Sequence, residues 1–399
     1  MSGSLNNIYN NVNFALHLHS NAISILQEQT STGSRINRVS DDPTDAYRVL
    51  GLNSQKSSLA NYMSTIADVM NMQETASTIL DDMSSTFAST KVSLTQILSG
   101  TYGEGEGGAN SRERVASQIN DILEQMVSSA NTKYSSHYLF GGSNTSSAPY
   151  VVERTDGQIS SVTYQGGSQN REIEMAPGVK SAAFYSGSDI FAVDERGTPV
   201  FSGSTGAAVG TGTSNIKGSA WLTVTNDGTN YKLSIDDGAT EITVPLAGDI
   251  SNIAVTDANG QVLYVDATNI NSTGTEMVQV PGTYDVFSSL ISIRDLLEND
   301  RDIPEADLKS LMDKLTESLD EVNNNLLQKQ VSIGAKIGFL DNLKNNLENI
   351  KFDTEEEATV IQEADIAQIA IDLSRREALY QMSLSTAGRL MSLSLLDFI

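Results

Sequence analysis

The stretch LKSLMDKLTESLDEVNNNLLQKQVSIGAKIGFLDNLKNNLENI, residues 308–350, decides the fold of this chain. Its apolar positions recur at alternating steps of four and three residues, which is the spacing of one helix face. At about 1.5 Å per residue such a helix extends roughly 65 Å. A face of this length is buried only against other long helices, so the stretch predicts an antiparallel helical rod. The face consists of Leu308, Met312, Leu315, Leu319, Val322, Leu326, Lys329, Ile333, Lys336, Leu340, Leu343, Leu347 and Ile350.

Proline positions show where the partner helices can lie, because a proline inside a helix costs about 3 kcal/mol. The chain has seven prolines, and none of them falls within 44–148 or 305–399. Pro43 follows Asp42, which predicts a helix start with an aspartate as its N-cap. Pro304 offers a similar start for the helix quoted above.

Two helices are predicted between 43 and 148. The Gly-rich run 100–108 predicts a loop between them, and the second helix is expected to end near 138–142. The first helix shows the 4-3 spacing in two parts, with a shift of phase between them. The inward positions are Leu59, Met63, Ile66, Met70 and Gln73, then Leu80, Met83, Phe87, Thr90, Leu94 and Ile97, and in the second helix Val115, Ile119, Ile122 and Met126.

The middle of the chain, 149–285, has a different character. It is rich in Gly, Thr, Ser and Asp, and its apolar residues alternate with period two, which predicts strands. Because both ends of this segment return to the helices, we predict a β domain inserted into the rod and projecting sideways from it. The expected strands are 221–225, 231–235, 241–244 and 262–265, with turns at Asp227–Gly228, Asp237–Gly238 and Asn259–Gly260.

Both ends of the chain are almost free of charge, although the formal net charge is −25. Glu28 is the only charged side chain within 1–33, and Arg389 and Asp397 are the only ones within 378–399. Charged residues are depleted where a surface packs against another protein. We therefore predict that the two ends are weakly ordered in the monomer and are buried between subunits on assembly.

Helical periodicity supports this prediction for both ends. The first end shows one apolar face, with Leu5, Ile8, Val12, Ala15, His19, Ala22 and Leu26. The last end shows another, with Ile366, Ala370, Leu373, Glu377, Tyr380, Leu384, Ala387, Met391, Ser394 and Phe398. The expected assembly interface consists of Leu5, Ile8, Val12, Ala15, Leu26, Leu373, Leu384, Met391, Leu395, Leu396 and Phe398.

Composition excludes several classes of function. A pI near 4.3 argues against binding to nucleic acid or to an anionic membrane, both of which need basic patches. No apolar run approaches the length of a membrane span. The chain has no cysteine, so disulfides and thiolate chemistry are excluded. Its first residues lack the pattern of a secretory signal, which fits a cytosolic protein or one exported unfolded by another route.

The inventory of catalytic and metal-binding residues is poor. His17 and His19 point to different faces of a helix and have no third ligand nearby. The segments 236–238 and 257–260 lack the spaced acids and closing glutamate of a calcium loop, so we interpret them as turns. The acidic run 355–357 is interpreted as a solvated helix start. We therefore expect no enzyme activity, no cofactor and no metal site.

Two stretches resemble motifs of the bacterial flagellin family. TGSRINRVSDDPTDA, residues 32–46, resembles the signature that follows the first helix of that family. ADIA at 364–367, ALYQ at 378–381 and the ending LSLLDFI at 393–399 resemble its C-terminus. The RVSDDP form, YLFGG at 138–142 and the SLLDF ending are most similar to the hook-associated branch of the family, whose members join the flagellar hook to the filament. The resemblance covers about 1–150 and 285–399.

The resemblance implies an inner layer of paired terminal helices that line a central channel, a surrounding layer of long helices and an outward-facing β domain. It implies export through the flagellar type III channel to an extracellular flagellum. Its implied partners are further copies of the chain, hook-associated protein 1, flagellin and an export chaperone. A joint between the layers, which contacts the neighbouring subunit, would be formed by Arg35, Asn37, Arg38, Asp41, Asp42 and Pro43. The same segment is also interpretable as a helix cap with an ion pair.

Two other functions remain open. A flagellin that forms the filament itself would have the same fold, but the DDP form and the C-terminal ending favour the hook-associated branch. The region 88–94 lacks the Arg-rich pattern that immune receptors bind in flagellins. The second alternative is an adhesin with the β domain as a binding head, which clustered aromatic residues would favour, yet Trp221 is the only tryptophan.

The predicted fold class is α+β, an antiparallel helical rod built from both chain ends with an inserted all-β domain. The expected divisions are an N-terminal inner helix and joint at 1–42, the first half of the rod at 43–148, the β domain at 149–285, the second half of the rod at 286–357 and a C-terminal inner helix at 358–399.

Overall fold

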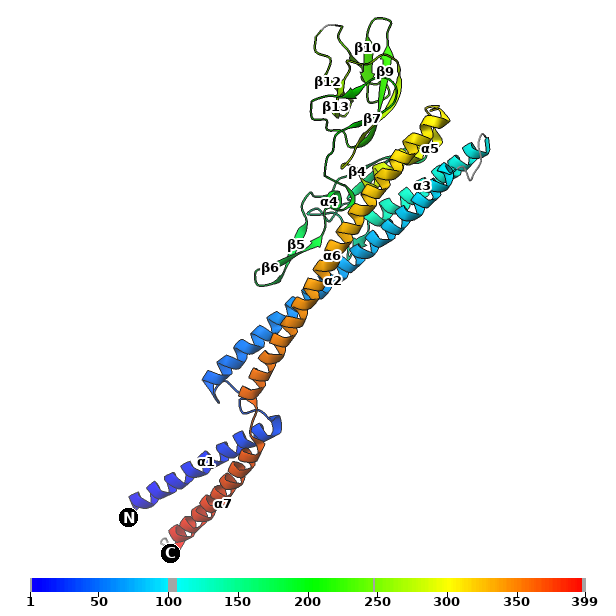
Figure 1. Ribbon diagram of the computed structural model, residues 1–399. Helices are drawn as coiled ribbons and strands as arrows, with labels where there is room; N and C mark the ends of the chain where they lie inside the picture. The colour runs from blue at the N-terminus through cyan, green and yellow to red at the C-terminus, as the bar shows by residue number, and fades with distance from the viewer. Residues whose placement is uncertain (1, 100–105, 247, 397–399) are drawn as a thin grey trace. The chain divides into compact units, whose positions relative to one another are not determined.

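The computed structural model describes residues 2–99, 106–246 and 248–396 (Figure 1). The chain forms two compact units, one made of 1–65 with 342–399 and the other of 66–341. Helices come from both ends of the chain and strands from its middle, which confirms the predicted α+β class. Among the described residues, no helix combines the length and the apolar character that crossing a membrane requires.

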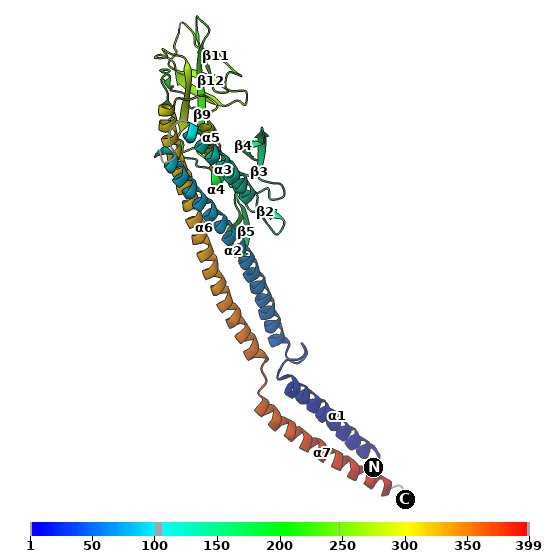
Figure 2. The same ribbon diagram turned by 90° about the vertical axis from the view of Figure 1, so that its right-hand side faces the viewer.

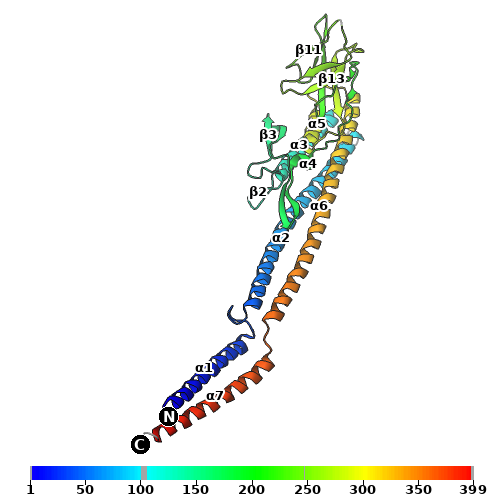
Figure 3. The same cartoon turned by 90° about the vertical axis from the view of Figure 1, so that its left-hand side faces the viewer.

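The first unit contains an antiparallel pair of terminal helices. Helix α1 spans Ser2–Thr32 and helix α7 spans Ile366–Leu396, and the two lie side by side in every view (Figure 1, Figure 2 and Figure 3). The unit also holds the beginning of α2 (Pro43–Leu98) and the end of α6 (Glu305–Gln362). The predicted apolar faces of α1 and α7 are used for this pairing. Their half-buried residues include Val12, Ala15, His19, Ala22 and Leu26 on α1, and Leu373, Tyr380 and Ala387 on α7.

The second unit is built around a helical core. The remaining parts of α2 and α6 pack with α3 (Glu106–Ala130) and α5 (Val286–Glu298). The predicted face of α6 is confirmed, because nearly all its apolar residues are buried, while Ile350 is 45% exposed. The buried members are Leu308, Met312, Leu315, Leu319, Val322, Leu326, Ile333, Leu340 and Leu347.

Helix α3 ends at Ala130, so the prediction of an end near 138–142 is wrong. The side chain of Asn131 leaves the helix pattern and binds the backbone of Tyr150, accepting from its N–H at 3.0 Å and donating to its carbonyl at 2.9 Å. A short hairpin of β1 (Lys133–Tyr134) and β2 (His137–Tyr138) follows. Leu139 and Phe140 are fully buried in the helical core, so the YLFGG motif anchors this loop.

All strand pairs of the middle segment are antiparallel. β3 (Tyr150–Thr155) pairs with β4 (Gln158–Tyr164), and β5 (Arg171–Ala176) pairs with β6 (Val179–Phe184), which leads to the short helix α4 (Gly187–Phe191). A five-stranded sheet has the order β11-β10-β9-β14-β7, and a three-stranded sheet has the order β12-β13-β8. The strand bounds are β7 Val200–Ser202, β8 Ala208–Val209, β9 Gly218–Asn226, β10 Tyr231–Ser234, β11 Ile242–Thr243, β12 Ile253–Thr256, β13 Val262–Asp266 and β14 Gly274–Val280.

The four predicted strands correspond to β9, β10, β11 and β13. The three predicted turns are confirmed, because Gly228, Gly238 and Gly260 have φ angles of 92°, 92° and 81°. The apolar sides of the two larger sheets form a second core, in which Leu222, Leu233, Val255, Leu263, Val265 and Val278 are fully buried.

Candidate functional site at the joint between helices

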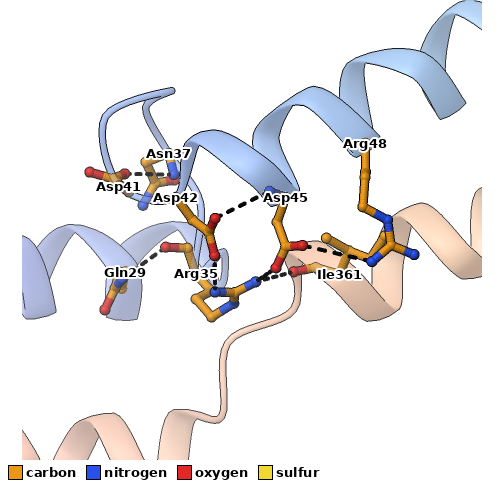
Figure 4. A network of polar contacts seen from close by, with 8 residues as sticks. All are labelled: Gln29, Arg35, Asn37, Asp41, Asp42, Asp45, Arg48 and Ile361. Atoms are coloured by element: carbon orange, nitrogen blue, oxygen red, sulfur yellow. Dashed lines mark hydrogen bonds and ion pairs between the residues drawn. The ribbon is translucent and has the colours of Figure 1, made fainter.

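The segment that connects α1 to α2 holds two clusters of polar contacts, one between Asn37 and Asp41 and one around the guanidinium of Arg35 (Figure 4). Its Nη1 donates to Asp42 Oδ2 at 3.1 Å, and its Nη2 forms an ion pair with Asp45 and donates to the carbonyl of Ile361 at 3.3 Å. One side chain therefore connects the start of α2 to the end of α6. These two segments lie more than three hundred residues apart in the chain.

Asp42 is the N-cap of α2, as predicted. Its carboxylate accepts from the backbone N–H of Asp45 at 3.1 Å, and Pro43 is the first residue of the helix. The Asp45 N–H and, after it, the Arg35 guanidinium hold the pKa of the Asp42 carboxyl below its ordinary value. Cap and ion pair therefore act together on the same carboxylate, as the second interpretation of this segment predicted.

Asp41 orders the loop itself. Its Oδ2 accepts from the backbone N–H groups of Asn37 at 3.1 Å and Arg38 at 2.8 Å. The Asn37 amide donates to the carbonyl of Ser34 at 3.2 Å, and Arg38 forms an ion pair with Glu28 at 3.1 Å. Arg35, Asn37, Arg38, Asp41, Asp42 and Pro43 thus lie in this loop and at the start of α2, and their contact with a neighbouring subunit stays a prediction.

Backbone hydrogen bonds connect this loop to the link between α6 and α7. The N–H of Arg35 donates to the carbonyl of Gln362 at 2.7 Å, and the N–H of Ala364 donates to the carbonyl of Gly33 at 3.1 Å. Gly33 has a φ of +68°, a conformation that residues with a Cβ rarely adopt, and α1 ends at the preceding residue. These two backbone hydrogen bonds therefore form a short ladder, which holds the α1–α2 loop against the link between α6 and α7.

Sequence reasoning missed the partners that α6 supplies. Arg48 pairs with Glu357 at 3.4 Å and Lys56 with Glu355 at 2.7 Å. Lys56 lowers the pKa of Glu355. The run 355–357 lies inside α6 and is not a helix start, so that interpretation is wrong. Basic residues on the first turns of α2 and an acidic run in the returning helix were the available signal for this pairing.

The joint is mostly solvent-exposed, since the side chains of Arg35 and Asp42 are 43% and 31% exposed. Exposed ion pairs contribute roughly 0–1 kcal/mol each, so the stability of the joint depends chiefly on its backbone hydrogen bonds and its cap. Within the described residues, no group of three His, Asp or Glu side chains is placed to hold a metal ion.

The terminal pair has a second, uncovered apolar surface. On α1, Phe14, Leu18 and Ile25 are 70%, 51% and 47% exposed, and on α7 the most exposed are Met382 at 66% and Ile371 at 63%.

The expected interface residues divide between the covered and the uncovered surfaces. Leu384 is 49% exposed, whereas Val12, Ala15, Leu26 and Leu373 are half-buried in the pair. The other expected interface residues lie outside the described part of the structure, namely the side chains of Leu5, Ile8, Met391, Leu395 and Leu396, and Phe398 as a whole.

One comparison with known proteins concerns the first part of the chain. Residues 4–145 match the bacterial flagellin N-terminal helical region. These residues contain nearly all of α1, the joint, and the whole of α2 and α3. No curated protein sequence matches the chain.

Two solved structures share the fold. Flagellar hook-associated protein 3 from Legionella pneumophila is 16% identical, with a TM-score of 0.51, and the match covers 78% of this chain and 98% of that one. FlgL from Xanthomonas campestris is 19% identical, with a TM-score of 0.50, and the match covers 77% of this chain and 98% of that one. At this level of identity, the likeness establishes the fold alone.

Proposed function

We propose that this chain is a structural subunit of the bacterial flagellum, of the hook-associated protein 3 type, which joins the hook to the filament by self-assembly. One observation carries the proposal. The segment that is similar to the flagellin N-terminal region begins with a charge-poor helix that pairs with the other chain end, and the pair still exposes several apolar side chains. The SLLDF ending and the RVSDDP form favour the hook-associated branch over a filament flagellin.

The uncovered face of the terminal pair supplies the driving force. Burial of apolar surface contributes about 25 cal/mol per Å², and the exposed side chains of Phe14, Leu18, Ile25, Met382 and Leu384 offer such surface. The face that contains Val12 and Leu26 is already half-covered by α7. We therefore assign the contact between subunits chiefly to the outward side chains of α1 and α7.

The joint would hold the terminal pair in place during assembly. Its ladder and the Arg35 cluster restrict both connections, from α1 to α2 and from α6 to α7. The entropy cost of ordering the pair on docking is thereby reduced. A pair on a flexible tether would lose more freedom on docking and bind more weakly.

The proposal implies a location and partners. The chain would be exported through the flagellar type III channel, assisted by an export chaperone, and would act outside the cell. Within the flagellum it would contact copies of itself, hook-associated protein 1 on the hook side and flagellin on the filament side. Its role would be structural and non-enzymatic.

A deletion strain tests the proposal. Cells lacking this chain should build hooks and synthesise flagellin but release that flagellin into the medium, because filament subunits would lack an end layer that continues their packing. Electron microscopy of the cells beside an immunoblot of the culture supernatant measures both effects. Filaments of normal length would contradict the proposal. Loss of the filament without secreted flagellin would show that the chain is the filament subunit itself.

A further inference from the structure

A cavity of about 520 Å³ lies between the five-stranded sheet and the beginning of α6, within unit 66–341. Ligand sites in proteins usually have volumes of roughly 300–1,000 Å³, so this cavity is large enough for a short saccharide or a molecule of similar size. The polar and aromatic part of its wall consists mainly of Ser202, Trp221, Arg301, Asp302, Asp307 and Lys314.

Trp221, the only tryptophan of the chain, reaches this cavity because side chains alternate along β9. The next residue, Leu222, is fully buried in the second core, so Trp221 lies on the opposite side of the sheet. There it is directly opposite Met277 of β14, and both side chains pack against the helical core. The indole is half-buried and forms part of the cavity wall, which gives the cavity an aromatic surface.

Arg301 holds this aromatic wall in place. Its guanidinium lies 5.0 Å from the centre of the Trp221 ring, and its Nη2 donates to Oδ2 of Asp237, in the turn after β10, at 2.8 Å. The same ion pair holds the pKa of the Asp237 carboxyl below its ordinary value. The two charges therefore compensate each other, and the ring is fixed before any ligand arrives.

The rest of the wall offers both donors and acceptors. The half-buried ammonium of Lys314 donates to Ser202 Oγ at 2.7 Å, which uses one of its three protons. The carboxylates of Asp302 and Asp307 are exposed and line the same cavity. Within the described part of the chain, none of these three charged groups forms an ion pair.

We propose that this cavity binds a neutral saccharide, which stacks on the part of the Trp221 indole that Arg301 leaves uncovered. A hydroxyl group is both a donor and an acceptor, so a ring with several hydroxyls satisfies an ammonium and a carboxylate together. An anion would be repelled by Asp302 and Asp307, and a cation would be repelled by Lys314. The inference goes beyond the proposed structural role and does not depend on it.

Trp221 also supplies the measurement, because the fluorescence of a single tryptophan reports directly on this cavity. The purified full-length chain is titrated with the methyl glycosides of glucose, galactose, mannose, rhamnose and N-acetylglucosamine, and with maltose, cellobiose and lactose. At least one of these should cause a saturable change in the emission. Sodium phosphate, glucuronate and spermidine are the charged probes, and none of them should do so.

Matched variants locate the binding. Lys314→Met keeps an apolar stem and removes the charged donor, so it should weaken binding about tenfold. Lys309→Met changes an exposed lysine of α6 outside the cavity and should leave the affinity unchanged. Asp307→Ala and its control Asp313→Ala repeat the comparison for an acceptor, without disturbing the bond from Lys314 to the sheet. Urea unfolding checks that every variant is folded.

The outcomes are distinct. Saturable binding of a neutral saccharide that the two cavity variants weaken and the two controls do not would support the proposal. A higher affinity for a disaccharide would indicate a unit of a polysaccharide as the ligand, and equal affinity would indicate a single sugar. Binding that is the same in cavity variants and controls, binding of a charged probe alone, or no saturable change with any saccharide would overturn it. These failures would leave the proposed function standing, since the deletion strain tests that function separately.

Discussion

The terminal helix pair and the helical core of residues 66–341 carry the same 4-3 spacing but bury their apolar faces to different extents. In the core, Leu315, Leu326 and Leu80 are fully inaccessible. No side chain is buried in the described part of α1, and Ile369 is the one buried side chain in the described part of α7. The difference lies in the number of neighbours, because a core helix is enclosed on several sides and a terminal helix has one partner.

This contrast shows what helical periodicity reports. The spacing identifies a face that packs, and it does not say whether one helix or several will cover that face. A helix with one partner keeps a second apolar side in solvent, as Phe14 and Leu18 do on α1. The exposed apolar side of such a helix can still pack against another protein, whereas the apolar side chains of a core helix are already covered.

Removal of residues 1–33 should give the largest effect, a complete loss of assembly. The truncated chain should remain soluble and folded, because the core of 66–341 contains none of the deleted residues. Removal of 378–399 should have the same result. Sedimentation and urea unfolding of each truncated chain measure the two properties. Rings or filaments from a truncated chain, or failure to fold, would break the distinction between the two regions.

Leu384→Asp should block assembly with little change in the monomer. Leu384 is 49% exposed, so the new charge stays in water in the monomer and is desolvated, at a cost of several kcal/mol, only when a neighbour covers it. The matched variant Val12→Asp places its charge in the half-buried face between α1 and α7. It should also block assembly, and circular dichroism should show a small additional loss of helix. A large drop in the thermal stability of the Leu384→Asp monomer would contradict this assignment.

Leu326→Ala should lower the free energy of unfolding by about 2–5 kcal/mol, the usual effect of truncating a buried leucine. The control Leu26→Ala, at a half-buried position of α1, should cost clearly less because solvent already reaches the site. Urea unfolding of both variants provides the comparison. Equal losses would mean that the terminal pair is as tightly packed as the core.

Two carboxylates should respond to pH in opposite directions. Burial raises the pKa of Glu276 on β14, which is 2% exposed and accepts from Thr205 Oγ1 at 2.8 Å. Its contribution to stability is therefore complete below its unfolded pKa of about 4.3 and is lost as the pH rises through its folded pKa. Asp42 has a lowered pKa, so its contribution is present above about 3.9 and is lost as the pH falls through its folded pKa.

Between pH 4 and pH 7, the free energy of unfolding measured in urea should therefore fall less in Glu276→Gln than in the normal chain. In the normal chain the joint should loosen below pH 4, and faster hydrogen exchange at residues 33–46 would detect this. In Asp42→Asn this dependence on pH should be absent. These are the smallest expected effects. The same slope in a variant and in the normal chain would show that the carboxylate in question does not titrate as its surroundings imply.

Much of the fold follows from the sequence alone, because periodicity and turn residues act locally. The buried face of α6, the N-cap at Asp42 and the turns at Gly228, Gly238 and Gly260 were all predictable in this way. The end of α3 was not. The helix ends where the side chain of Asn131 forms hydrogen bonds with the backbone of Tyr150. The two residues are 19 positions apart in the chain, and helical periodicity does not reveal such a contact.

The residues that form the joint could be predicted from the sequence, but the residues of α6 that contact them could not. The local hydrogen bonds of Asp41 and Asp42 follow from capping chemistry. The bond from Arg35 to Ile361 and the pairing of Arg48 with Glu357 depend on how α6 returns to the start of α2. Likewise, the sequence located the apolar face of Val12 and Leu26, and only the packing shows that α7 already covers it.

The antiparallel pairing of α1 and α7 places the first turns of one helix beside the last turns of the other (Figure 1). If the chain assembles as proposed, a tag fused to either end would therefore lie close to the surface assigned to the contact between subunits. The Asp227–Gly228 turn offers a better insertion site, since no heavy atom lies within 4 Å of a Cβ position at Gly228. A fluorescent label or a peptide epitope inserted there would decorate each incorporated chain without altering either terminus.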